Sequence, residues 1–232
     1  MTTWRSQGGN VVLHAEILEK IPGIAHGFGV RGVALPQYLE ALALSACASF
    51  TTDQVHGNRV HRLPVTSSED VLEGDAFITD EPGVVCHVRS ADCVPIIIAD
   101  AKRRAVAAVH AGWRGTACDV AGAAVAEMRR AFGTNPADCV AAIGPRICGS
   151  CYEVGDEVRE ALGVLPIGES WRIDDRRIDL GAANAALLTR AGLRPEKIDL
   201  LPHCTFCDES FTSYRRDRSE AGRQVNFVVI RE

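Results

Sequence analysis

Residues 89–115 read RSADCVPIIIADAKRRAVAAVHAGWRG, and within them two apolar runs flank a short polar stretch. The runs Val94–Ala99 and Ala105–Val109 are short and uncharged, with many branched or small residues, which predicts two buried β-strands. The polar residues 100–103 between them are few enough for the loop of a hairpin. The segment therefore predicts an antiparallel pair of buried strands.

A cysteine and a histidine lie at the ends of these two strands. If Asp100 pairs with Arg103 across the turn, Cys93 lies directly opposite His110. Directly opposed residues hold their Cβ atoms about 4.5–5.5 Å apart. That spacing suits a thiolate and an imidazole that share one metal ion through bonds of about 2.3 and 2.0–2.1 Å. We therefore predict that Cys93 and His110 lie together.

His56 is the third candidate ligand, in the segment DQVHGN of residues 53–58. A histidine followed by Gly-Asn is expected on a turn, from which its ring can point into a cleft. Two histidines and one cysteine leave an open coordination position, as in catalytic zinc sites, whereas structural zinc sites have four protein ligands. A metal ion in such a site activates water. Taken singly, a cysteine such as Cys93 is usually explained by packing and a histidine such as His56 by the turn, and spacing alone favours these explanations over a shared metal site.

The composition is that of a globular protein: 232 residues, 47% hydrophobic and 24% charged, enough to bury a sizeable core. A net charge of −5 argues against a nucleic-acid partner. The N-terminal stretch lacks the apolar region of a signal peptide, and no window approaches the length of a membrane span. We therefore expect a cytoplasmic protein, without a membrane partner, whose nine cysteines stay reduced.

The rest of the chain alternates between strand and helix patterns without an internal repeat or a long linker. Strands are predicted at residues 10–18, 58–65, 76–79, 84–88, 139–143, 198–201 and 224–230, and helices at 35–50, 116–132, 153–162 and 180–191. In the helix over 116–132, Thr116 is the expected N-cap and Gly133 the stop. This mixed order predicts a single α+β domain over residues 1–232, with mixed β-sheets packed between helices.

Three arginines are candidates for holding an anion. Arg31 follows the glycine-rich HGFG, Arg114 precedes the best-defined helix, and Arg215 lies in the arginine-rich segment of residues 214–218. Loop amides, a helix N-terminus and an arginine together form a phosphate site, although a single arginine is often only a surface ion pair. Asp75 and Asp92 are candidate general bases or ligand-orienting residues, and each is also a common turn former.

Two Cys-x-x-Cys pairs form a second group of thiols, Cys148 with Cys151 and Cys204 with Cys207. Together they resemble a four-thiolate structural zinc site, but the 52 residues between the pairs exceed the spacing of zinc ribbons. From spacing, we expect ordinary reduced thiols near the active site, with a second metal site as the alternative.

Eight short motifs occur in order along the chain: HGF (26–28), QVHG (54–57), GDA (74–76), SADCVP (90–95), HAGWRG (110–115), IGP (143–145), CYEVG (151–155) and SYRRD (213–217). In these motifs the chain resembles the YfiH-like family, also called laccase-domain or multicopper polyphenol oxidase proteins. The resemblance implies an α+β fold likened to cysteine hydrolases. It also implies zinc-dependent phosphorolysis of adenosine and inosine to base and ribose 1-phosphate, with adenosine deaminase activity.

The resemblance also implies site residues, a cofactor and substrates. The histidine–cysteine–histidine metal triad of the family corresponds to His56, Cys93 and His110. We assign catalysis to these three and Asp75, and substrate binding to Arg31, Gln54, Arg114 and Arg215. Zinc is the expected cofactor, with copper as the alternative, and a nucleoside and phosphate are the expected small-molecule partners. The loop after HGF and the tail after SYRRD depart from the family pattern, which bears on Arg31.

Three other functions are compatible with parts of this pattern. Two histidines and a cysteine also describe a blue-copper site, but the chain has seven histidines, no His-x-His pair and a mid-helix Met128, which disfavours a polyphenol oxidase. A metal-free hydrolase would use Cys93 as nucleophile and His110 as base, and the resemblance extends to proteins linked to peptidoglycan precursor editing. The Cys-x-x-Cys pairs would suit a zinc-stabilised binding module.

Overall fold

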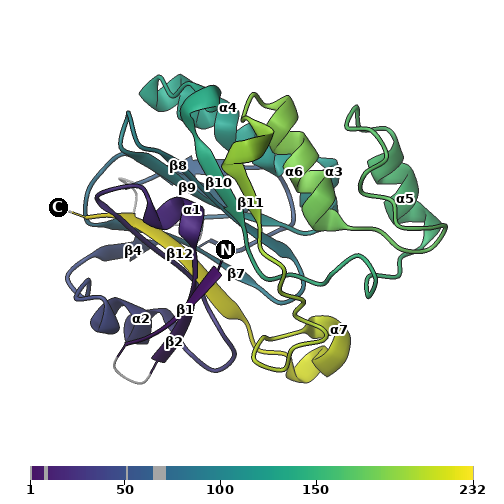
Figure 1. Ribbon diagram of the computed structural model, residues 1–232, viewed down its shortest axis with the longest axis horizontal. Coiled ribbons are helices and arrows are strands. Elements are labelled where there is room, and N and C mark those ends of the chain that lie inside the picture. The colour runs from purple at the N-terminus through teal and green to yellow at the C-terminus, as the bar shows by residue number, and fades with distance from the viewer. Residues whose placement is uncertain (1, 8–9, 51, 65–71, 232) are drawn as a thin grey trace.

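Two six-stranded β-sheets form the body of the molecule, in a computed structural model that describes residues 2–7, 10–50, 52–64 and 72–231. The sheets pack face to face, and helices cover their outer faces (Figure 1). Both sheets contain parallel and antiparallel neighbours. The predicted α+β class with mixed sheets is therefore confirmed.

The first sheet has the order β1-β2-β3-β12-β7-β4 and is antiparallel except between β4 and β7. Its strands are β1 (Thr2–Gln7), β2 (Asn10–Ala15), β3 (Ile24–Phe28), β12 (Gln224–Ile230), β7 (Val84–Ser90) and β4 (Ala48–Phe50). Strand β12 comes from the C-terminal end of the chain and lies between β3 and β7, so the sheet joins both ends of the sequence.

The second sheet has the order β11-β10-β8-β9-β6-β5. Its outer pairs, β11 with β10 and β6 with β5, are parallel, and the pairs between them are antiparallel. Its strands are β11 (Ile198–Leu200), β10 (Val140–Ile143), β8 (Val94–Asp100), β9 (Ala105–Ala111), β6 (Ala76–Thr79) and β5 (Val60–Arg62). The predicted hairpin thus lies at the centre of this sheet.

Seven α-helices accompany the sheets in the described ranges: α1 (Glu16–Glu19), α2 (Leu35–Ala41), α3 (Trp113–Ala117), α4 (Val120–Phe132), α5 (Asp156–Gly163), α6 (Leu180–Arg190) and α7 (Tyr214–Asp217). Short 3₁₀ turns occupy residues 136–138, 195–197 and 218–220. Helix α2 packs on the first sheet, and α4 and α6 pack on the second (Figure 1). Within the described ranges, no helix combines the length and the apolar character needed to cross a bilayer.

Both faces of the central strands are buried, which explains why their sequences are continuously apolar. On β9, Val106 and Ala108 face the core between the two sheets, whereas Ala107 and Val109 face the core under the helices. Alternate residues of a strand point to opposite faces, so a strand between two layers needs apolar residues at every position.

The register of the hairpin differs from the prediction by two residues. Asp100 pairs with Ala105, and Pro95, not Cys93, lies opposite His110. The prediction that Cys93 directly opposes His110 is therefore wrong. Cys93 precedes β8 as a diagonal neighbour of His110 on the same face, and that position still brings the two side chains together.

The side chain of Asp100 explains this register. Its Oδ1 accepts hydrogen bonds from the backbone N–H groups of Lys102 (3.0 Å) and Arg103 (3.2 Å). This arrangement is an Asx-type turn, which places Asp100 at the end of the strand instead of inside the loop. Residues 101–104 then form the loop, and Arg104 takes a left-handed conformation with φ of 49°.

The helix predicted over 116–132 is broken into α3 and α4. Asp119, with φ of 56°, accepts a hydrogen bond from the N–H of Gly122 and is the N-cap of α4, in place of Thr116. A Cβ at Gly122 would lie 2.4 Å from Asp119 Oδ2, so the cap needs glycine there. The helix ends at Gly133, with φ of 68°, as predicted.

Other boundaries are shorter than predicted. The helix expected over 35–50 ends at Ala41, because Ala43 has a left-handed φ of 58°, and the chain then continues into β4. The strand expected over 10–18 ends at Ala15, where α1 follows. The strand expected over 58–65 spans 60–62, and Val65 lies outside the described residues. Strands β1 and β3 were not predicted.

Candidate metal centre and its cleft

Adjacent strands place Asp75 and His110 opposite each other. Strand β6 pairs with β9 so that Ala76 faces Val109, and the next pair outward is Asp75 with His110, whose N–H donates to the Asp75 carbonyl at 2.7 Å. Their side chains therefore share one face. The imidazole Nδ1 lies 2.8 Å from Asp75 Oδ1, and both residues are buried.

The same carboxylate fixes the loop that carries His56. The backbone N–H groups of His56 and Gly57 donate to Asp75 Oδ1 and Oδ2 at 3.1 and 2.8 Å. These bonds hold His56 in a left-handed conformation with φ of 60°. Its ring then lies edge-on to that of His110, with centroids 5.0 Å apart. One buried carboxylate thus positions two of the predicted ligands.

Cys93 completes the group from the start of β8. Continuing the register of β8 and β9 by one residue places Cys93 opposite Gly112. A Cβ on Gly112 would lie 3.1 Å from the Cys93 Sγ and 2.7 Å from the His56 Cδ2. The absence of a side chain at this position leaves the space in which the histidine ring lies beside the sulfur.

The predicted triad is brought together, with one ligand atom of each of His56, Cys93 and His110 within 4.8 Å of the others. Because Asp75 accepts from Nδ1 of His110, the lone pair on Nε2 is left for a metal, as in carboxylate–histidine–metal arrangements. Two nitrogens and one sulfur are donors that zinc and copper both accept. These residues therefore fit a metal ion with an open position.

Within the triad, Cys93 and His110 stabilise each other's charged forms. Burial raises the pKa of the Cys93 thiol, but interactions with His110 and His56 outweigh burial and lower this pKa to about 6. Burial lowers the pKa of His110, yet Asp75 and Cys93 raise it to about 9. Without a metal the pair is therefore a thiolate with an imidazolium at neutral pH. A metal cation binding there takes the place of the imidazolium proton.

The triad lines a cleft of about 1180 Å³. Four arginines and two tyrosines also line it: Arg89, Arg215, Arg218, Arg223, Tyr152 and Tyr214. The two carboxylates in the wall, Asp53 and Asp92, are outnumbered, so the cleft carries an excess of positive charge. Of these arginines and tyrosines, only Arg215 was assigned from the sequence, although Arg89 directly precedes SADC and Tyr152 lies in CYEVG.

Two of the residues assigned to substrate binding are not among those that line this cleft. Arg31 donates to the backbone carbonyl of Glu209 at 3.0 Å and forms an ion pair with Asp217. Arg114 stacks on Trp113, with its Cζ 4.1 Å from the ring centroid, and is largely exposed. Arg31 thus joins two loops, and Arg114 lies in the first turn of α3 and does not line the cleft.

The other two assigned residues, Gln54 and Arg215, do line the cleft. The amide of Gln54 donates to the carbonyl of Arg89 and accepts from its N–H, both at 2.7 Å, so it ties the loop before His56 to β7. Arg215 donates to the Glu153 carbonyl at 3.1 Å and lies over the ring of Tyr152, 5.3 Å from the centroid.

Asp75 and Asp92 take different positions. Asp75 lies behind His110, fully buried and not among the cleft-lining residues. Asp92 has φ of 80° and accepts from the Thr205 hydroxyl at 2.7 Å and from the Arg215 N–H at 2.6 Å. Asp75 therefore orients the ring of His110, and Asp92, the residue before Cys93, links the start of β8 to the C-terminal loops.

The chain is similar to known proteins over most of its length. Residues 35–231 match the family described as multi-copper polyphenol oxidoreductase laccase. The chain is 35% identical over 228 residues to the Escherichia coli (strain K12) protein named purine nucleoside phosphorylase YfiH, covering 87% of this chain and 90% of that protein. It is 41% identical over 173 residues to adenosine deaminase RL5 of an unidentified prokaryote, covering 71% of this chain and 66% of that protein.

The fold is also similar to solved structures. The crystal structure of YlmD from Geobacillus stearothermophilus superposes with a TM-score of 0.88 at 28% sequence identity, covering 100% of both chains. The matched residues include all three ligands of the triad and the cleft around them. The chain therefore belongs to the multi-copper polyphenol oxidoreductase laccase family, the family of the YfiH and YlmD proteins.

Proposed function

We propose that this protein is a zinc-dependent enzyme of purine nucleosides, which cleaves adenosine and inosine with phosphate and deaminates adenosine. The observation that carries the proposal is the group of two histidines and one cysteine in a cleft lined by four arginines and two tyrosines. The names of the relatives, purine nucleoside phosphorylase and adenosine deaminase, support the same substrate class.

The arginines suit the phosphate. In phosphorolysis a phosphate oxygen forms a bond to the ribose C1′ while the bond from C1′ to the base nitrogen breaks, and its electron pair leaves with the base. The attacking anion must be held and oriented, which arginines do through paired N–H donors. Arg89, Arg218 and Arg223 line the cleft with Arg215. We assign phosphate binding to this group.

The tyrosines suit the nucleoside. Tyr214 is 53% exposed at the cleft and offers an aromatic face for stacking of a purine. Burial, together with the negative charge of Cys93, raises the pKa of Tyr152 to about 12. The Tyr152 hydroxyl therefore keeps its proton and can donate a hydrogen bond to substrate near the triad.

His56, Cys93 and His110 would hold the metal. A bound zinc ion would supply Lewis acidity, which activates water for the attack on the purine C6 that deamination requires. Asp75 keeps His110 in the tautomer that exposes Nε2, and it holds the loop of His56 in place. We further propose that the protein works in the cytoplasm, where all nine cysteines would remain reduced.

A hydrolase without a metal is the second candidate, because the Cys93 thiolate beside a protonated His110 is also the arrangement of a cysteine nucleophile. The position of His56 favours the metal enzyme, since a nucleophile and its base need no second histidine. The family description favours copper. Among the described residues, however, the groups suited to a metal ion are this triad and four cysteines, which differ from the histidine-rich cluster of a multicopper oxidase.

The test is incubation of the purified, zinc-loaded protein with adenosine and phosphate, followed by separation of the products. We expect inosine, adenine, hypoxanthine and ribose 1-phosphate, and loss of all of them in Cys93→Ala. Arg223→Ala should raise the KM for phosphate, and Arg129→Ala, at an exposed position of α4 that does not line the cleft, is the matched control. Nucleoside activity that survives in Cys93→Ala would reject the proposal. So would a protein that oxidises phenols when loaded with copper and shows no activity on nucleosides.

A further inference from the structure

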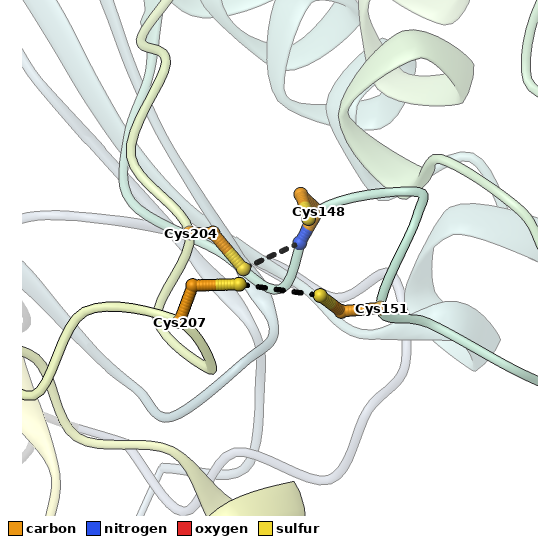
Figure 2. A group of neighbouring side chains, drawn as sticks. All are labelled: Cys148, Cys151, Cys204 and Cys207. Carbon is orange, nitrogen blue, oxygen red and sulfur yellow. Dashed lines mark hydrogen bonds between the residues drawn. The ribbon is translucent and has the colours of Figure 1, made fainter.

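Four cysteines from two distant loops form a cluster separate from the triad. Cys148 and Cys151 follow β10, and Cys204 and Cys207 follow β11; their sulfur atoms all lie within 4.8 Å of one another. Figure 2 shows Cys204 and Cys207 on one loop pointing toward Cys151 on the other, with Cys148 beside them. Because β10 and β11 are parallel neighbours, both loops begin at the same end of the sheet, where the two strands have their C-terminal residues.

The arrangement has the features of a tetrahedral metal site. Four sulfurs bonded to zinc at about 2.3 Å lie about 3.8 Å apart. The Sγ atoms of Cys151 and Cys207 are 3.3 Å apart, well beyond a disulfide bond of about 2.05 Å. The backbone N–H of Cys148 donates to the Cys204 Sγ at 3.3 Å (Figure 2), the kind of outer hydrogen bond that stabilises a metal-bound thiolate.

Nearby charges favour thiolates. Arg146 is 5% exposed and interacts electrostatically with Cys148 and Cys204. Arg177 interacts in the same way with Cys151 and donates to the carbonyl of Ser150 at 3.4 Å. Four thiolates around one divalent cation carry a net charge of −2, and these two guanidinium groups, which also pair with Asp179 and Asp174, would offset part of it.

We propose that Cys148, Cys151, Cys204 and Cys207 bind a structural zinc ion, in addition to the metal of the triad. Four protein ligands close the coordination shell, so this ion would be structural and not catalytic. The long sequence gap that disfavours a zinc ribbon is bridged here by the parallel pairing of β10 and β11. The inference does not depend on which reaction the triad catalyses.

The proposed ion would hold two walls of the cleft together. The residue after Cys151 is Tyr152, which lines the cleft. The residue after Cys204 is Thr205, whose hydroxyl donates to Asp92, next to Cys93. Fixing the four cysteines thus fixes the backbone on both sides of the substrate site. The role of the zinc ion would be to order the substrate site before the substrate binds.

The test counts zinc in the full-length protein. Metal-free, reduced protein is titrated with zinc, and bound metal is measured by elemental analysis. We expect two zinc ions per chain in the wild type, one in Cys207→Ser and one in Cys93→Ala. Cys118→Ser, an exposed free cysteine outside both groups, is the matched control and should bind two.

Cobalt in place of zinc gives a second, spectroscopic readout of the same variants. A four-thiolate site gives intense sulfur-to-cobalt charge-transfer absorption, which we expect in the wild type and in Cys93→Ala but largely lost in Cys207→Ser. The proposal is overturned if the wild type binds one zinc that Cys93→Ala loses and Cys207→Ser keeps. It is also overturned if the mass of the unreduced protein reveals disulfides within the cluster and no second zinc.

Discussion

Replacing Asp75 with asparagine tests how one buried carboxylate organises the metal centre. Asp75 is fully buried and accepts three hydrogen bonds, from His110 Nδ1, the His56 N–H and the Gly57 N–H. Asparagine has nearly the same shape but only one acceptor oxygen. If that oxygen faces His110 and His56, the amide NH₂ meets the N–H of Gly57. If it is reversed, the NH₂ donates to Nδ1 of His110, and the proton moves to Nε2, which then cannot bind a metal.

The expected loss of stability follows from the number and kind of these hydrogen bonds. Hydrogen bonds to a charged group contribute about 1.5–3 kcal/mol each and neutral ones about 1 kcal/mol. Exchanging three bonds to a carboxylate, about 4.5–9 kcal/mol, for at most two bonds to an amide, about 2 kcal/mol, should therefore lower the free energy of unfolding by about 2.5–7 kcal/mol. Loss of an outer partner of a ligating histidine should weaken zinc binding about 10–100-fold, or about 1.4–2.8 kcal/mol.

Zinc affinity is measured by competition with a chelator, and stability by urea unfolding of the metal-free protein. The measurements are made in a Cys207→Ser background so that only the triad reports. Asp80→Asn is the matched control, because Asp80 directly follows β6 and its side chain pairs with Arg62 at the surface. A zinc affinity for Asp75→Asn within twofold of the control, in a folded protein, would refute the positioning role.

Two further predictions concern the same centre. Gly112→Ala should weaken zinc binding at the triad about tenfold or more, because the new Cβ would lie 2.7 Å from the ring of His56 and 3.1 Å from the Cys93 sulfur. Gly155→Ala, with open space around it, is the control. Equal zinc affinity of the two variants would contradict the prediction. Zinc binding should release about one proton between the pKa of Cys93, about 6, and that of His110, about 9, because the metal-free triad holds one proton there, on His110. The logarithm of the zinc affinity should then rise by about one per pH unit over this range and level off above it; calorimetry in buffers of different ionisation enthalpy counts the protons, and a count of zero contradicts a protonated His110.

The apolar runs were enough to predict the central strands, whereas the candidate ligands were assigned from the residues at the ends of these runs together with the family resemblance. Val94–Ala99 and Ala105–Val109 are buried on both faces, and only continuous apolar sequences tolerate that position. Boundaries were harder to predict where a side chain caps its own backbone. Asp100 and Asp119 both do so. The cap at Asp100 gives a hairpin register two residues away from the predicted one, and the cap at Asp119 starts a new helix where one continuous helix was predicted.

Contacts between strands far apart in sequence could not be predicted. The role of Asp75 depends on β6 pairing with β9, and the arginines of the cleft come from β7, from α7 and from the segment between α7 and β12. Sequence spacing favoured ordinary thiols for the Cys-x-x-Cys pairs, whereas the parallel pairing of β10 and β11 places their four sulfurs together.

The sequence by itself determined the class of fold and indicated the three candidate ligands of the triad, because the periodicity of apolar residues and the chemistry of side chains are local properties. Only the tertiary structure decided which carboxylate orients His110, which arginines face the cleft and that four cysteines converge. Those features depend on the order of strands in a sheet, and that order is set by how two sheets and their helices bury apolar surface together.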